Sequence, residues 1–224
     1  MRRVLSALIG LTLVIILTAP TAYADDAGKA QSVVDKAQEA LQSFAADPEM
    51  VWFHDNVDSA KGLLIVPTMV KGGFIFGGSG GSGALLARGD PPQGWSYPAF
   101  YIIGTVTFGL QIGGEVSEII FLVMTERGMD AFLSSEFKLG GDVSVAIGPV
   151  GVGLKAQTAD ILAFARSKGV YGGLNLEGSV FKIRNDWNQA YYGPGTRPTD
   201  IFVTGSVSNQ GADSLRAAVA QVAQ

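Results

Sequence analysis

The chain has 224 residues, of which 30 are Gly, one is His and none is Cys. The absence of Cys excludes disulfides, zinc–thiolate sites and cysteine nucleophiles, and a single His excludes a metal site built from two imidazoles. Lys and Arg number 16 against 20 Asp and Glu, so the formal net charge is −4 and nucleic acid is not expected as a partner. With 47% hydrophobic residues, the chain can bury the core of one folded domain.

The first 24 residues have the pattern of a secretory signal peptide. Residues 2 and 3 are both Arg, 4–17 form an apolar run, and 22–24 give a small-residue A-x-A cleavage site followed by two Asp. The alternative is an uncleaved N-terminal anchor, but the run is shorter than the roughly 20 apolar residues of a spanning helix. Because no Cys follows the run, a lipid-anchored lipoprotein is excluded. We therefore expect residues 1–24 to be removed, leaving 25–224 as one periplasmic or secreted domain.

Two helices are predicted where the mature chain begins. Over 27–46 apolar residues recur at three- and four-residue steps, Asp26 is positioned to cap the first turn, and Asp47-Pro48 ends the helix. The mixed segment 49–61 can hold a second, shorter helix.

Beyond Gly62 the sequence is mostly of β type. The glycine-dense segment 77–83 predicts a tightly curved hairpin connection, and 185–198 is punctuated like a loop. Segment 160–166 fits a helix or a strand by period alone. Strands are predicted at 63–66, 74–76, 84–87, 97–110, 115–124, 142–147 and 170–183, and helices at 125–133, 200–203 and 213–222. No linker or charge run marks a second domain.

Local motifs give little support for catalysis. Residues 78–83 satisfy G-x-G-x-x-G, but no helix of useful length follows and no α/β alternation surrounds them, so a dinucleotide site is not expected. His54 and Asp55 are adjacent, which rarely gives a catalytic geometry, and a surface or helix-end histidine is favoured. Glu115 and Glu118 would face opposite sides of a strand. A hydrolase with dispersed carboxylates is therefore the weaker alternative, and no catalytic, metal-binding or cofactor-binding residues are assigned.

An aromatic cluster follows the Pro91-Pro92 pair. It allows two interpretations, a membrane-dipping loop or a buried corner of the sheet, and the second is favoured. The cluster comprises Trp95, Tyr97, Phe100 and Tyr101.

Several ordered stretches together resemble one known family. They are AKGLLIVP (60–67) with KGGFIFGGSGGSG (71–83), WSYPAF (95–100) with FGLQIGG (108–114) and VSEIIFLVM (116–124), and GPVG (148–151), SKG (167–169) and NQAYYG (188–193). Their order and spacing resemble the SYLF family, a lipid-binding domain found in yeast actin-patch proteins, a vertebrate SH3-containing phosphoinositide binder and secreted bacterial proteins. The resemblance covers residues 30–222.

The resemblance implies an α+β fold: a single domain with a curved, mainly antiparallel, barrel-like sheet flanked by helices. It implies that 160–166 is a strand, paired through the turn at 167–169 to residues 170 onward. It also implies binding of phosphoinositides or other anionic lipids, actin binding in fungal members, and no catalysis. The predicted helix 27–46 departs from the basic membrane helix of eukaryotic members, because Lys29 and Lys36 are balanced by Asp35 and Glu39.

We therefore expect a non-catalytic, lipid-binding module of the bacterial cell envelope, without cofactors. Its partner would be a phospholipid or membrane surface, and the alternative is an envelope structural domain that binds another protein. If anionic headgroups bind, Lys61, Lys71 and Arg88 are the predicted contacts, because they flank the glycine-rich hairpin. Free backbone N–H groups of that hairpin would complete an anion-binding nest.

Overall fold

A computed structural model describes residues 20–73, 76–90, 94–108, 113–148, 158–167, 176 and 178–224. Its helices are α1 (Pro20–Ala45), α2 (Val51–Val57), α3 (Glu126–Leu133), α5 (Asn185–Tyr192), α6 (Pro198–Phe202) and α7 (Asp213–Val222), with a 3-10 turn at Gln210–Ala212. Its strands are β1 (Gly62–Gly73), β2 (Phe76–Ala87), β3 (Ala99–Phe108), β4 (Gly113–Val123), β5 (Glu136–Lys138), β6 (Val145–Gly148), β7 (Ile161–Ser167) and β8 (Val180–Ile183).

All these strands belong to one sheet with the order β5-β8-β3-β2-β1-β4-β7-β6. Every neighbouring pair is antiparallel except β6 and β7. The α+β class and the mainly antiparallel sheet expected from the sequence are therefore confirmed.

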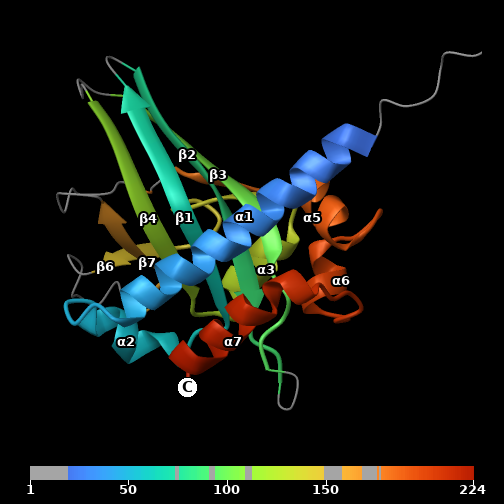
Figure 1. Ribbon diagram of the computed structural model, residues 1–224. Helices are drawn as coiled ribbons and strands as arrows, with labels where there is room; N and C mark the ends of the chain where they lie inside the picture. The colour runs from blue at the N-terminus through green and yellow to red at the C-terminus, as the bar shows by residue number, and fades with distance from the viewer. Residues whose placement is uncertain are drawn as a thin grey trace, which may run out of the picture.

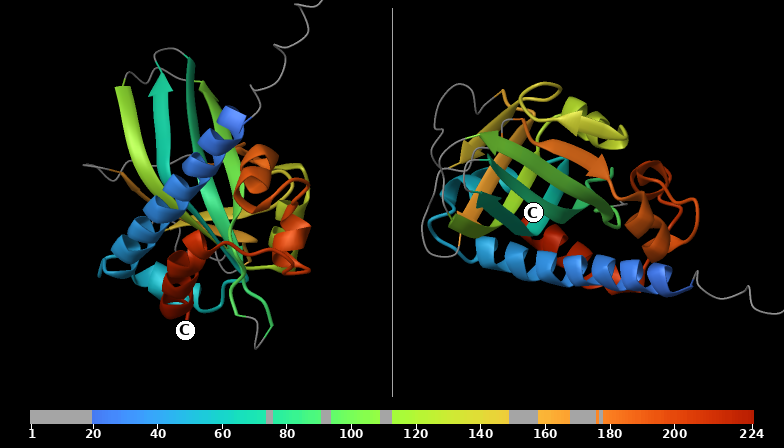
Figure 2. Two further views of the ribbon diagram at one scale, coloured as in Figure 1. Left: turned by 45° about the vertical axis from the view of Figure 1, so that its right-hand side comes forward. Right: turned by 90° about the horizontal axis from the view of Figure 1, so that it is seen from above.

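The sheet is strongly curled, as Figures 1 and 2 show. Phe121 on β4 and Phe181 on β8 are four strands apart, which is about 19 Å in a flat sheet at ~4.8 Å per strand. Their ring centroids are nevertheless only 5.4 Å apart. The concave face therefore closes on its own apolar core, which includes these rings together with Tyr101 and Phe132.

The outer face of the sheet carries a second core beneath α1, and α5 and α7 lie beside this helix (Figure 1). The buried side of α1 repeats at three- and four-residue steps, which confirms the predicted helix, through Ala30, Val34, Ala37, Leu41 and Phe44. The helix begins at Pro20, so the expectation that Asp26 caps it is wrong. None of the helices in the described residues combines the length and apolarity needed to cross a membrane.

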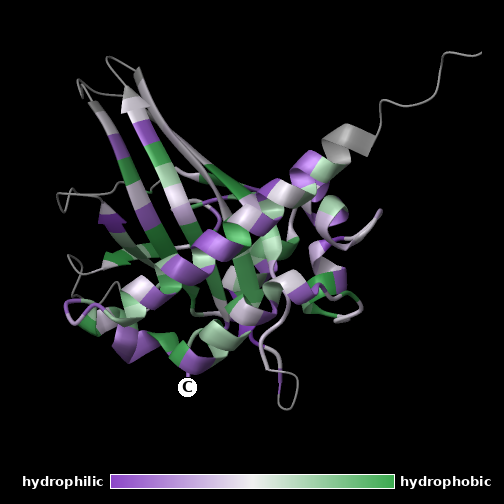
Figure 3. Cartoon of the chain, in the orientation of Figure 1, coloured by the Kyte–Doolittle hydropathy of each residue, from purple (hydrophilic) through white to green (hydrophobic). Residues whose placement is uncertain are grey.

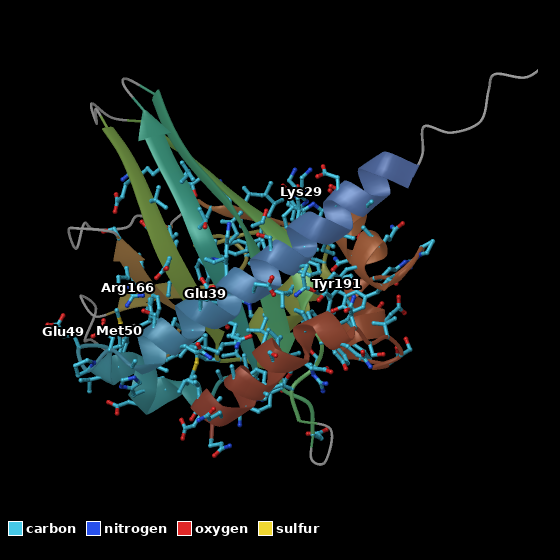
Figure 4. The ribbon with its side chains drawn as sticks, in the orientation of Figure 1. Lys29, Glu39, Glu49, Met50, Arg166 and Tyr191 are labelled. Atoms are coloured by element: carbon cyan, nitrogen blue, oxygen red, sulfur yellow. The ribbon has the colours of Figure 1, made fainter. Side chains whose placement is uncertain are left out.

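Polar contacts hold α1 near its C-terminal end and in its N-terminal half, close to the labelled Arg166 and Tyr191 of Figure 4. At the C-terminal end, the Arg166 guanidinium of β7 donates to Ser43 Oγ and pairs with Glu118 at 2.7 Å. Toward the N-terminal end, the Tyr191 hydroxyl of α5 donates to Gln31 Oε1 at 2.7 Å. The helix is thereby fixed to both the sheet and the C-terminal helices.

Two predictions about strands are wrong for reasons of packing. Strand β1 does not end at Pro67 but continues to Gly73 through an irregularity in register between Ile65 and Thr68. The segment 77–83 is not a hairpin connection but part of β2, which pairs with both β1 and β3. Its Gly83 fits close to the irregularity, since a Cβ there would lie 2.8 Å from the Ile65 carbonyl oxygen.

The other predicted elements are mostly recovered. Segment 160–166 is a strand, as the resemblance implied, and α7 matches its predicted bounds. The prediction of a loop at 185–198 is wrong, because this segment contains α5, whose Trp187 and Tyr191 are buried. Of the predicted turn at 167–169, residue 167 ends β7, and residues 168 and 169 lie outside the described residues, as do 170–175 and 177 of the predicted strand 170–183. The end of that predicted strand forms β8.

Candidate functional site

The three predicted basic contacts are divided between the two ends of β1. Lys61 precedes β1 and Arg88 follows β2, and their backbones are bonded, because the Arg88 N–H donates to the Lys61 carbonyl at 2.8 Å. Lys71 lies ten residues farther along, roughly 30 Å away at ~3.3 Å per strand residue. The structure thus brings Lys61 and Arg88 together and leaves Lys71 apart.

Lys61 and Arg88 each have a partner within the protein. Lys61 Nζ lies 2.7 Å from Glu126 Oε1, at the first turn of α3. The Arg88 guanidinium donates to the Ala223 carbonyl at 2.9 Å and lies 4.9 Å from the centre of the Trp95 ring. These partners reduce the capacity of both cations to bind an external anion.

Lys71 lies on the concave face because of the irregularity at Pro67. Before it, Leu63 and Ile65 face the core beneath α1, whereas beyond it Met69 faces the concave core. An extra residue in a strand reverses the alternation of side chains, so odd-numbered positions change face. The Lys71 side chain is half-buried and has no hydrogen bond or ion pair within the described part of the chain.

A polar row crosses four strands at the level of Lys71. In register, Thr105 of β3 pairs with Ser79, Ser79 with Lys71, and Lys71 with Glu115 of β4. The hydroxyls of Thr105 and Ser179 are buried and share a hydrogen bond of 2.5 Å. Two residues farther along β4, on the same face, buried Ser117 donates to Glu115 Oε1 at 3.4 Å. The row therefore sets one cation, one anion and several hydroxyls on one face of the sheet.

The predicted anion nest of free glycine amides is wrong. Residues 77–83 lie inside β2, where the pairing with β1 and β3 involves their backbone in the sheet ladder. A strand paired on both sides has no series of free N–H groups to offer a ligand. Side chains of the polar row, rather than backbone amides, are the available polar groups near Lys71.

The other sequence candidates have structural roles. His54 is exposed, and its Nε2 lies 3.1 Å from the Ala45 carbonyl at the end of α1, as expected for a helix-end histidine. Of the predicted aromatic cluster, Trp95, Phe100 and Tyr101 are buried and Tyr97 is half-buried. This favours the interpretation as a buried corner of the sheet, not that as a membrane-dipping loop. The described residues contain no cluster of His, Asp or Glu suited to a metal ion.

One buried carboxylate was not singled out by the sequence. Asp160, just before β7, accepts hydrogen bonds from Thr125 Oγ1 at 2.7 Å and from the backbone N–H and hydroxyl of Ser144. Burial acts to raise the pKa of Asp160, but these hydrogen bonds and the nearby Arg127 lower it overall. The Thr125 hydroxyl also accepts from the Gly128 N–H as the N-cap of α3. Asp160 therefore has a structural role, since it links the start of α3 to the segment before β6. No pattern in the sequence indicates this role.

Residues 104–222 match the family model Ysc84, described as "Las17-binding protein actin regulator". The human SH3 domain-containing YSC84-like protein 1 is 31% identical over 183 residues, which cover 77% of this chain and 53% of the human protein. Protein YSC84 of Saccharomyces cerevisiae is 34% identical over 179 residues, covering 73% of this chain and 37% of the yeast protein. LAS seventeen-binding protein 3 of the same species is also 34% identical over 179 residues, covering 73% and 38%. The chain thus spans about half or less of the length of these curated relatives.

Proposed function

Because the chain belongs to the Ysc84 (SYLF) family, we propose that it is a non-catalytic, lipid-binding module of a bacterial cell envelope. Its ligands would be phospholipid headgroups at a membrane surface. The signal-peptide pattern of residues 1–24 and the absence of Cys support a periplasmic or secreted location.

The observation that carries this proposal is the state of Lys71. It is the one predicted contact that lacks a partner within the described residues, whereas Lys61 and Arg88 are engaged with Glu126 and Ala223. An unpaired, half-buried ammonium gains from a phosphate more than a paired one, because no internal ion pair has to be broken. We therefore propose that Lys71, near the end of β1 that extends beyond α1 (Figure 1), makes the main headgroup contact.

Co-sedimentation with vesicles of phosphatidylglycerol and phosphatidylethanolamine tests the proposal. A surface-proximal Lys contributes about 1 kcal/mol to binding an anionic membrane, so Lys71→Gln should weaken binding roughly fivefold. Salt should weaken it as well. Lys61→Gln and Arg88→Gln are matched controls with a smaller expected effect. Absence of binding at low salt would overturn the proposal, and an equal loss from all three variants would remove the special role of Lys71.

Protein binding is the second candidate function, and one surface favours it. On the outer face of the sheet, Val70 and Val116 are paired in register and are 53% and 44% exposed. Toward β2 and β3 the same row continues through exposed Gly80 and Gly104, neither of which has a side chain. Strands β1 to β4 extend beyond α1 at this level (Figure 1), and Figure 3 shows pale and green segments among the purple ones there.

A photo-crosslinking residue at position 70 tests this second candidate in intact cells. We expect it to capture a defined protein partner, and the same residue at Val203, which is 67% exposed on the C-terminal side of α6, to capture none. Crosslinks to lipid alone, or identical products at both positions, would contradict protein binding at this face.

A further inference from the structure

In two places in the sheet a Lys and a Glu lie directly opposite each other on neighbouring strands, but only one of these two pairs forms an ion pair. Glu136 of β5 pairs with Lys182 of β8, and their side chains form an ion pair of 2.8 Å. Lys71 of β1 likewise pairs with Glu115 of β4, yet these two side chains form no ion pair. Residues directly opposite each other on antiparallel strands have Cβ atoms about 5 Å apart, so either pair is able to close.

The open pair lies in a less solvated place than the closed one. Lys71 and Glu115 are both half-buried on the concave face, whereas Glu136 and Lys182 have side chains that are 51% and 57% exposed. Charges that have lost part of their water are costly without a partner. Among the described residues, Glu115 receives only the long hydrogen bond of 3.4 Å from Ser117. A ligand that contacts both charges would therefore relieve the desolvation of both.

The sign of the charges decides which ligand fits. A simple anion would meet Lys71 but would also approach the carboxylate of Glu115 one strand away, and a simple cation has the converse difficulty. A zwitterion carries one group for each. Ser79 of β2 pairs in register with Lys71 on the side away from Glu115, and its hydroxyl is a further donor for a phosphate oxygen.

We propose that the Lys71–Glu115 pair binds a phosphoethanolamine group, with the phosphate against Lys71 and the primary ammonium against Glu115. This inference deepens the proposed lipid-binding function and rests on it. Two carbon atoms join the phosphate ester oxygen to the ammonium, which suits a contact with two neighbouring strands. A primary ammonium donates hydrogen bonds to a carboxylate, whereas the quaternary ammonium of a choline group has no N–H to donate. The group could belong to a lipid headgroup or to a free small molecule, and both are tested.

The first experiment is an NMR titration of the purified protein with soluble O-phosphoethanolamine, phosphocholine and inorganic phosphate. We expect phosphoethanolamine to bind about tenfold more tightly than either of the others, since only it satisfies both charges. Lys71→Gln should abolish binding of all three. Glu115→Gln should remove the preference for phosphoethanolamine while improving the binding of inorganic phosphate, because a repelling charge is lost. Glu136→Gln is the matched control and should change nothing.

A charge-exchanged double variant, Lys71→Glu with Glu115→Lys, guards against effects of folding. It keeps one charge of each sign on the same row, so it should restore the phosphoethanolamine preference that the single variants lose. Equal affinity of the unmodified protein for phosphate and phosphoethanolamine would overturn the inference, as would an unchanged preference in Glu115→Gln.

Vesicles separate this inference from the proposed function. Binding to phosphatidylethanolamine vesicles above phosphatidylcholine vesicles of equal surface charge would support a lipid source of the headgroup. Vesicle binding without that preference would leave lipid binding intact and refute the zwitterion site. Binding of soluble phosphoethanolamine without any vesicle binding would support a free ligand and refute the membrane function.

Discussion

The two halves of β1 show how differently one strand can be used. From Leu63 to Val66 every side chain is fully buried, with alternate residues packed into the cores on the two faces of the sheet. Beyond Pro67, Val70 is 53% exposed and Lys71 is half-buried without a partner in the described residues. The covered half holds the fold together, and the open half presents side chains whose contacts the fold does not use.

The core that packs against the covered half of β1 should be the most sensitive to substitution, and Phe121 of β4, which pairs in register with Leu64, belongs to it. Phe121→Ala deletes a fully buried ring that meets Phe181 edge-on, so we expect a loss of about 3–5 kcal/mol in the free energy of unfolding. Val70→Ala, in the open half, should change it by less than about 0.5 kcal/mol. Urea denaturation measures both, and similar losses would contradict the division of the strand into two halves.

The close approach at the irregularity gives a second, smaller effect. In Gly83→Ala the new Cβ would lie 2.8 Å from the Ile65 carbonyl oxygen and 2.9 Å from side-chain atoms of Leu64 and Val66. Relief of such overpacking moves both strands, so we expect a loss of about 1–3 kcal/mol, measured by thermal unfolding. Unchanged stability would mean that Gly83 is not required for the close packing of β2 against the irregularity of β1 between Ile65 and Thr68.

Asp160 ties α3 and β6 to the covered end of the sheet, and its effect should depend on pH. The folded-state pKa of Asp160 is lowered, so the carboxylate stabilises the fold above its unfolded pKa of about 3.9 and loses that contribution as pH falls through the folded pKa. At pH 7, Asp160→Asn should cost about 1–2 kcal/mol, because Ser144 and Thr125 lose a charged acceptor.

Unfolding free energies of the unmodified protein and of Asp160→Asn, measured from pH 7 to pH 2, test the direction of this pH dependence. The difference in stability between the two proteins should narrow only at acid pH. A gap that stays constant into strong acid would show that the shape of the side chain matters rather than its charge.

Sequence reasoning succeeded where one period dominates. The spacing of apolar residues predicts α1 and α7, and the β-branched run of 115–124 predicts β4, because one buried face repeats along each element. Glycine carries no such signal, so the sequence predicts a connection at 77–83 although β1 and β3 hold this segment in the sheet. The Asn, Gly and Pro residues of 185–198 likewise concealed α5, whose Trp187 and Tyr191 are buried against other elements.

The site was only partly accessible to the same reasoning. Lys71 could be selected as a basic residue near the glycine-rich segment, but the face that it occupies depends on the irregularity at Pro67, which reverses the alternation. Its relation to Glu115 depends on the register between strands that are 44 residues apart in sequence at that pair. Neither feature leaves a periodic signal, so neither follows from the sequence alone.

The smallest predicted effect has the opposite sign and concerns the open half. Gly104 has ordinary strand geometry on the outer face, and a Cβ there would meet no described atom within 4 Å. Gly104→Thr should therefore stabilise the protein by about 0.5–1 kcal/mol, since a β-branched residue favours a strand over glycine. Gly94→Thr is the control and should destabilise, because its φ of 66° disfavours any side chain.

Differential scanning calorimetry of both variants distinguishes the two reasons for a glycine. If Gly104→Thr is more stable but loses the crosslink from position 70, the bare backbone serves an approaching partner rather than the fold, because glycine in a strand often marks such an approach. If it is less stable, the outer face of the open half is packed in solution, and its difference from the covered half of β1 is smaller than the exposures of Val70 and Val116 indicate.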